Sequence, residues 1–517
     1  MNASWTGCWS TFKSPLRVIV QSLLQSRLKL RMRFQELKQQ LVHAQRALTQ
    51  LARQLELQRE ENRRLRLHVR LLETPLAHRP GLLPDDPPVH RHGYGPRMVS
   101  LAVNLARAVG LRGAERALQI VFDWWGVPQQ LPHWTAIRTW VQRLGVAALP
   151  ETLELADDWV WIVDHSNQIG PEKVLVVLAV RSAHLPPPGA ALEHHHVRVL
   201  AVRPGTTWKR ADVAAVYAAL AEQHGVPRAV LCDGAVELRE GVFSLNRGDS
   251  EVLVLQDFKH KAANLFKALL QPDPRFAEFS TQLARTRSAI QQTELAHLTP
   301  PSLKQKARFM NLGAILNWGM MALWVLDHPQ ACARQWVTAE RLEEKLGWLR
   351  SFARELAEWQ ECQQVLNRGV GFSNRQGLGH GSSVQLGAQL LPGLQHAASR
   401  LLARQLIEFV EQAERPLQGT ERLPLSTEIL ESSFALYKQL ERQHSKGGFT
   451  SLLAGFAALP TPVTPERIRS AFTRVGIKDV KQWVHDHLGD TLTSKRAATY
   501  SEFKRTISSA TNLAVIG

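Results

Sequence analysis

The first periodic pattern of apolar residues lies near the start of the chain. From Leu30 to Leu72 apolar side chains recur at alternating spacings of four and three residues, while Arg, Lys, Gln and Glu fill the other positions. This heptad spacing predicts a coiled coil, and Asn62 on its seam is the kind of polar residue that fixes register and strand number. We therefore expect a homo-oligomer; a single long solvated helix is the alternative.

Three helical patterns follow, over 98–109, 113–125 and 135–144, with Gly145 as the expected stop of the third. In this third helix the apolar stripe leaves Arg138, Gln142 and Arg143 facing away from the core. A helix, a turn and a helix with exposed Arg and Gln suit reading of the DNA major groove. These three residues are therefore candidates for DNA contacts, and a plain helical packing unit is the alternative.

From Trp159 the spacing of apolar residues becomes that of β-strands. The pattern predicts five strands, over 160–163, 174–180, 197–202, 229–232 and 251–256, with a helix at 210–224 between the third and the fourth. Residues 258–420 are expected to be helical, interrupted by a Gly-rich loop at 367–383. Helices over 426–443 and 449–459 and a helical tail complete the prediction.

These patterns divide the chain into seven segments. They are an N-terminal segment with the coiled coil (1–74), a linker (75–96), a helix-turn-helix domain (97–150), the first part of an α/β core (151–270), an all-helical insertion (271–420), the final part of the core (421–463) and a helical tail (464–517).

Charge narrows the class of partner. Lys and Arg number 63 against 46 Asp and Glu, a formal net charge of +17, which favours a polyanion such as nucleic acid. The 4 cysteines form no CxxC pair, so neither a zinc knuckle nor a disulfide framework is indicated. No apolar run approaches the roughly 20 residues that span a bilayer, and no signal-peptide pattern is present. We expect a cytoplasmic, nucleoid-associated protein that binds double-stranded DNA and contacts no membrane.

Two of the predicted strands end on an acid. Asp164 follows the first strand and Asp233 follows the fourth, and this order of elements places those two strands side by side in an RNase H-like sheet. Carboxylate oxygens suit Mg²⁺ or Mn²⁺, and two such ions roughly 3.5–4 Å apart promote attack on a phosphodiester. We therefore expect two metal ions at this end of the sheet.

The helix 426–443 offers two candidates for a third acid. Ser426 can cap it, so Glu428 falls in the first turn, where the helix dipole alone explains an acid. Glu431 lies one turn further and shares its face with Lys438, which suits a metal ligand beside a phosphate anchor. Glu431 is therefore the favoured ligand.

These residues resemble the DDE transposases of bacterial insertion sequences, over residues 90–460. The similar stretches are IVDHSNQIG, VLCDGAVEL, VLVLQDFKHKAANLFKALL and LESSFALYKQL. Asp257 and His260 are similar to the C/D-x-x-H element of that family. Glu431 and Lys438 match the E-x6-K half of its YREK signature, whereas the Tyr and Arg of the signature would fall on Pro424 and Thr427.

The resemblance implies an α/β RNase H-like core split by an all-α insertion. It implies catalytic metal ligands at Asp164, Asp233 and Glu431, with Asp257 and His260 in support, and the binding, cleavage and transfer of mobile-element ends. Two alternatives remain: an RNase H-like nuclease without strand transfer, and a non-catalytic DNA-binding protein derived from a transposase.

Two further features are open to two interpretations. The tract His194–His196 invites a metal site, although a solvated loop before a strand is favoured. Trp208 either packs in the core, which is favoured, or stacks on a flipped base.

Overall fold

The computed structural model describes residues 20, 22–28, 30–35, 38, 52–63, 86–89, 92–126, 130–167, 172–246, 251–303, 309, 312–332, 336–441, 449–488 and 492–516. The chain forms two compact units, one of Met1–Pro84 and Ile120–Gln129 and one of Asp85–Gln119 and Gln130–Gly517. In the first unit, residues 22–28, 30–35 and 52–63 are helical. Leu30, Phe34 and Leu55 of the predicted coiled-coil seam are exposed there. The other apolar seam residues lie outside the described residues.

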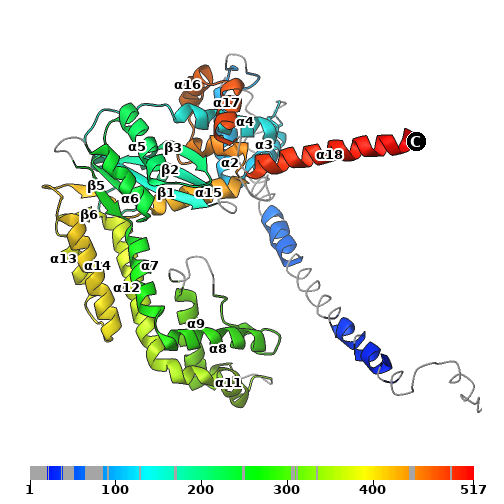
Figure 1. Ribbon diagram of the computed structural model, residues 1–517, viewed down its shortest axis with the longest axis vertical. Coiled ribbons are helices and arrows are strands. Elements are labelled where there is room, and N and C mark those ends of the chain that lie inside the picture. Colours follow the sequence, from blue (N-terminus) through cyan, green and yellow to red (C-terminus); the bar gives the residue numbers. More distant parts are fainter. Residues whose placement is uncertain are drawn as a thin grey trace, which may run out of the picture. The chain divides into compact units, whose positions relative to one another are not determined.

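A five-stranded mixed sheet lies in the second unit (Figure 1). The order is β3-β2-β1-β4-β5; β1, β2 and β3 are antiparallel neighbours, and β4 and β5 run parallel to β1. The strands are β1 (Trp159–Asn167), β2 (Lys173–Arg181), β3 (Arg198–Gly205), β4 (Ala229–Cys232) and β5 (Leu253–Gln256). The five predicted strands and the adjacency of the first and fourth are confirmed. The prediction that the first strand stops before Asp164 is wrong, because β1 stays paired with β2 as far as Asn167.

Helices cover both faces of this sheet. α5 (Arg210–His224), α6 (Val236–Gly241) and the 3₁₀ turn η4 (Val242–Leu245) bury one face, around Trp161 and Val163. Successive strand residues point to opposite faces, so Asp164 leaves that core. Two other elements also pack on the strands: α15 (Glu428–Glu441) against β1, and η8 (Ser451–Ala458) against β3. The acid of β1 and the helix that carries Glu431 are thereby brought to the same region.

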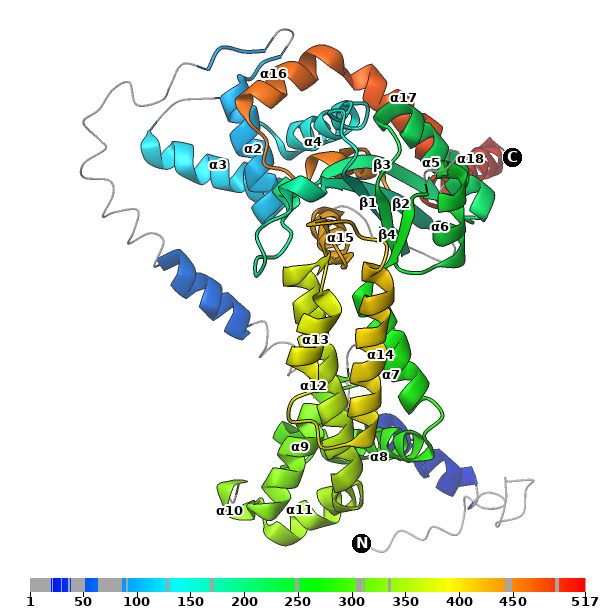
Figure 2. The same cartoon turned by 90° about the vertical axis from the view of Figure 1, so that its left-hand side faces the viewer.

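The segment between β5 and α15 is helical, as predicted. Its elements are α7 (Phe258–Leu270), α8 (Pro274–Ile290), η5 (Ala296–Leu298), α9 (Gly313–Asp327), α10 (Pro329–Cys332), α11 (Ala339–Leu346), η7 (Gly347–Phe352), α12 (Ala353–Gln376), α13 (Ser382–Leu390) and α14 (Ala397–Glu414). α7, α12 and α14 pack side by side (Figure 2). A short bridge joins β6 (Leu378–Gly379) to β7 (Arg422–Leu423).

The Gly-rich break predicted at 367–383 is confined to 377–381, so its predicted extent is wrong. α12 continues to Gln376, and α13 begins at Ser382. Gly369 lies inside α12, where an added Cβ would meet Cζ of Phe258 at 2.7 Å. The glycine therefore serves close packing of α12 on α7 rather than a turn.

The remaining helices are α2 (Pro96–Val109), α3 (Leu111–Trp125), α4 (Trp134–Ala148), α16 (Pro465–Arg474), α17 (Ile477–Leu488) and α18 (Leu492–Ile516). α2 and α4 pack on α16, and α4 also packs on α17 and η8. The prediction that α4 ends at Gly145 is wrong, because α4 continues to Ala148. A Cβ at Gly145 would collide with the backbone of Ala454 in η8. This glycine permits close packing inside a continuous helix. In the described part of the chain, each helix is too short or too polar to cross a membrane.

Candidate active site

In each of the parallel strands β1, β4 and β5, an aspartate follows the last residue of the parallel pairing. The parallel pairing ends with Val163 opposite Cys232 and with Cys232 opposite Gln256. The next residue of each strand is an aspartate: Asp164, Asp233 and Asp257. Because neighbouring strands lie roughly 4.8 Å apart, this register brings the three acids into one row across the sheet.

The surroundings of Asp164 disfavour its negative charge. It is half-buried, and its Oδ1 accepts a hydrogen bond of 2.6 Å from the backbone N–H of His165. Burial, and next the negative charge of Asp233, raise the pKa of Asp164 to about 7, although the His165 bond and the charge of His260 act in the opposite direction. A cation placed beside Asp164 and Asp233 would remove this repulsion.

Asp257 has a structural role, because its carboxylate is fully buried and both of its oxygens accept hydrogen bonds. Its Oδ2 accepts the backbone N–H of His260 at 2.8 Å and lies 2.7 Å from Nδ1 of the same residue. Its Oδ1 accepts the N–H of Thr427 at 2.8 Å. Asp257 thus caps α7 and fastens the segment that leads into α15. The bond to Asp257 raises the pKa of His260 to about 8 against the effect of burial, so the imidazole is cationic at neutral pH.

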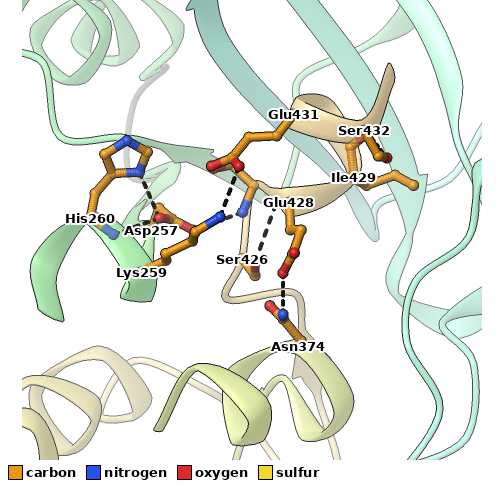
Figure 3. Close-up of polar contacts among 10 residues, drawn as sticks. Asp257, Lys259, His260, Asn374, Ser426, Glu428, Ile429, Glu431 and Ser432 are labelled. Carbon is orange, nitrogen blue, oxygen red and sulfur yellow. Dashed lines mark hydrogen bonds and ion pairs between the residues drawn. The ribbon is translucent and has the colours of Figure 1, made fainter. Parts of the chain in front are cut away.

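Glu431 is bound by a lysine that the sequence analysis missed. Nζ of Lys259, in the first turn of α7, lies 2.8 Å from Oε2 of Glu431 (Figure 3). The position of this lysine between Asp257 and His260 is the signal that could have indicated it. The negative charge of Glu431 also raises the pKa of Asp164, after burial and Asp233, so Glu431 belongs electrostatically to the acid row.

Glu428 points to a different neighbour. Its backbone N–H donates to Oγ of Ser426 at 3.2 Å, which confirms the predicted cap of α15. Its carboxylate accepts a hydrogen bond from the amide of Asn374 on α12 (Figure 3). Glu428 therefore joins α15 to the helical insertion, whereas Glu431 faces the cations of α7.

The carboxylates of this region are the right type of ligand for a hard divalent cation, but they are not arranged around one point. Carboxylate oxygens are what Mg²⁺ and Mn²⁺ prefer. Within the described ranges, no three His, Cys, Asp or Glu side chains are arranged as a metal site. Glu431 is paired with Lys259, and both oxygens of Asp257 are occupied by hydrogen bonds. Asp164 and Asp233 remain the two acids that could accept a cation without first losing an ion pair.

The histidine tract and Trp208 have structural partners. His194, in the 3₁₀ turn η3 (His194–His196), places Nε2 at 2.9 Å from Oγ of Ser432 on α15. The tract therefore contacts the helix that carries Glu431. Trp208 packs against the core of the sheet, and its ring lies 5.7 Å from that of His165. The favoured core interpretation of Trp208 is confirmed.

The prediction that Gln142 and Arg143 face away from the core is wrong. Both side chains are 5% exposed. Nε2 of Gln142 donates to the carbonyl of Ser451 at 2.8 Å, and Arg143 donates to the carbonyls of Val475 at 2.9 Å and Phe472 at 3.0 Å. The C-terminal helices cover this face of α4, so these donors bind backbone carbonyls of the same chain and are not presented to DNA.

The two other predicted DNA contacts are placed differently. Arg138 is half-buried, with its guanidinium carbon 5.9 Å from the centre of the Trp134 ring. Lys438 is exposed on α15. Among these four predicted residues, Lys438 is the one whose side chain is openly accessible.

Comparisons with known proteins give a distant structural likeness. Neither a family model nor a curated protein matches the chain. A solved structure described as "Drosophila P element transposase strand transfer complex" aligns with a TM-score of 0.35 at 9% sequence identity, over 82% of this chain and 98% of that chain. A likeness at this level supports neither a fold nor a function by itself, so the assignment rests on the residues above.

Proposed function

We propose that this protein is a DDE-type DNA transposase that binds mobile-element ends and catalyses metal-dependent strand cleavage and strand transfer. The observation that carries the proposal is the register that brings Asp164 and Asp233 together, with Glu431 supplied by a helix packed on β1. The strand order β3-β2-β1-β4-β5, followed by a helical segment before α15, supports an RNase H-like core with an insertion.

Asp164, Asp233 and Glu431 would hold two Mg²⁺ or Mn²⁺ ions. Such ions lower the pKa of an attacking water and stabilise the leaving oxygen. The raised pKa of Asp164 supports this assignment, because burial and its acidic neighbour leave its charge without compensation. Glu431 would exchange Lys259 for a metal ion, which leaves the ammonium free for a DNA phosphate. Asp257 and His260 would keep α7 and α15 in place and add positive charge.

DNA binding is supported by the net charge of +17 and by the exposed Lys438, two turns beyond Glu431 on α15. Phosphate contacts of this kind supply affinity without sequence preference. The 97–150 segment loses Gln142 and Arg143 as readers of bases, so any sequence reading there depends on other side chains.

A coiled coil at 30–72 would pair protomers and so bring two element ends together. Leu55 of the seam is 49% exposed, and Leu57, which lies off the seam, is 72% exposed. Leu55→Lys should lower the mass measured by light scattering, whereas Leu57→Lys should not. Equal masses for wild type and both variants, at the value of one chain, would count against the coiled coil.

The function is tested by cleavage and joining of DNA that carries the element's own flanking ends. Asp164→Asn, Asp233→Asn and Glu431→Gln should each lose activity by about 10³-fold or more, because each loses a metal ligand. Glu428→Gln, on the same helix, is the matched control and should keep activity within a few-fold. Activity should also require Mg²⁺ or Mn²⁺.

The same assay separates the alternatives. Cleavage without joining of pre-cut ends would indicate an RNase H-like nuclease. DNA binding without cleavage by wild type, and unchanged in Asp164→Asn, would indicate a non-catalytic DNA-binding protein.

A further inference from the structure

A pocket lies away from the acids, at the start of β1. Its volume is about 410 Å³. Residues from the ends of three strands, from η3 and from α16 line it, including Trp159, Arg181, Arg198, His195, His196 and Arg467. Arginine and histidine thus dominate the ionisable groups of this pocket.

Several charged side chains that line the pocket already form ion pairs. Arg181 forms ion pairs of 2.7 Å with both Glu154 and Asp158. Glu151, the other acid in the lining, is bound by Arg474 at 2.6 Å. The acids of the pocket are therefore committed to arginines other than Arg198 and Arg467.

Arg198 and Arg467 are left without an anion. The only hydrogen bond of the Arg198 guanidinium within the described residues is a long one of 3.4 Å to the carbonyl of Val197. Across the same residues, the guanidinium of Arg467 has no hydrogen bond or ion pair, although its side chain is half-buried. Two guanidinium groups thus face one pocket with almost no acceptor between them.

This arrangement disfavours the charge of the half-buried Arg467. Burial lowers the pKa of Arg467, Glu151 opposes that effect, and the charges of Arg198 and Arg474 lower the pKa further. A guanidinium nevertheless keeps its proton at physiological pH. The repulsion is therefore relieved by bound solvent or by an anion, and planar guanidinium groups match phosphate oxygens well.

We propose that this pocket binds a phosphate group, with Arg198 and Arg467 as its two principal donors and the DNA backbone as its source. The choice of DNA rests on the proposed function. Such a contact would fix the position of the duplex without reading its sequence, at a place separate from the acid row.

The test is the salt dependence of binding to double-stranded DNA. The variant Arg198→Gln/Arg467→Gln should reduce the slope of log K against log salt by about 1, since each phosphate contact contributes about 0.9. The control Arg368→Gln/Arg404→Gln removes the same charge from exposed positions of α12 and α14 and should leave the slope nearly unchanged. Arg198→Gln alone, at an exposed residue, should give part of the effect even if the double variant folds poorly.

Inorganic phosphate provides a second readout that does not depend on DNA. It should raise the Tm of wild type and raise that of the double variant much less. An unchanged slope together with an equal phosphate effect on both proteins would overturn the site, and so would an equal loss of slope in the control. A phosphate effect confined to wild type, with no change in slope, would overturn DNA as the source and leave a free-phosphate site. If wild type binds no DNA, the proposed function fails, and the phosphate arm still decides the site.

Discussion

The sheet region carries two charged clusters of opposite sign, the row of acids and the arginine pocket. Where the parallel pairing of β1 with β4 ends, Asp164 lies beside Asp233. Burial and the charge of Asp233 raise the pKa of Asp164 to about 7. At the start of β1, Arg467 lies near Arg198, and burial together with neighbouring arginines lowers its pKa. In each cluster the charged form is disfavoured until a counterion arrives.

The two clusters differ in whether a change of protonation can remove the unfavourable charge. A carboxyl with a pKa near 7 takes up a proton at neutral pH, so the acid row adjusts when no metal ion is bound. Arginine has no such option in the accessible pH range. The charge of the acid row therefore responds to pH and to cations, whereas the charges of Arg198 and Arg467 can be balanced only by an anion or by solvent.

The largest change in stability is expected from Asp257, whose carboxylate joins α7 to the segment that leads into α15. Asp257→Ala removes three contacts of a fully buried carboxylate and leaves the N–H groups of His260 and Thr427 without this acceptor. The free energy of unfolding should fall by about 3–5 kcal/mol, measured by urea unfolding. Asp273→Ala, which removes a helix cap from α8, should cost about 1 kcal/mol. Equal losses in the two variants would show that Asp257 is only a cap.

The pH response of Asp164 should come next in size. Its pKa is about 7 in the folded protein and about 3.9 in an unfolded chain. Between these values the folded state holds the extra proton, so stability falls as pH rises towards 7 and stays low above it. In chelator, Asp164→Asn should be more stable than wild type by about 4 kcal/mol at pH 8 and nearly equal to it near pH 4. The exposed control Glu222→Gln should show no such difference, and a gain for Asp164→Asn that is independent of pH would contradict the assignment.

Two arginines should respond in opposite directions. Arg143 donates to two buried carbonyls, so Arg143→Gln should lower the free energy of unfolding by about 2 kcal/mol. Arg467 lacks such acceptors among the described residues, and Arg467→Gln should leave the Tm unchanged or slightly raised in buffer without phosphate. Losses of equal size would mean that Arg467 is a packing residue rather than part of an anion site.

The smallest effect concerns the lysine that competes for Glu431. Lys259→Gln removes an ion pair of 2.8 Å from the acid row. Mn²⁺ affinity, followed by electron paramagnetic resonance, should rise several-fold, which corresponds to about 1 kcal/mol. Lys267→Gln, further along α7 and exposed, is the control. Weaker Mn²⁺ binding to Lys259→Gln would show that the lysine supports the site instead of occupying it.

Some of this architecture could be predicted because its signal is local. Short apolar runs indicated the five strands, and the acids after two of them were visible in the sequence before the sheet was known. The same local reasoning failed on α4. Its polar residues at Gln142 and Arg143 were assigned to solvent, because the sequence does not show that α16 and α17 cover that face.

Glycine gave a similar error for the same reason. Gly145 and Gly369 were interpreted as a stop and as part of a loop, yet both lie inside helices at close contacts with distant segments. A missing side chain permits either a turn or a close approach, and the neighbouring residues do not distinguish between them.

The sequence by itself determined the succession of strands and helices along the chain and which acids follow the apolar runs of β1 and β4, because these patterns lie in nearby residues. Only the tertiary structure decided that Lys259 reaches Glu431, that Asp257 joins α7 to α15, and that Arg198 and Arg467 share a pocket. Each of these contacts joins segments far apart in the chain. Their geometry depends on how helices pack on the sheet, and the pattern within any one segment does not specify that packing.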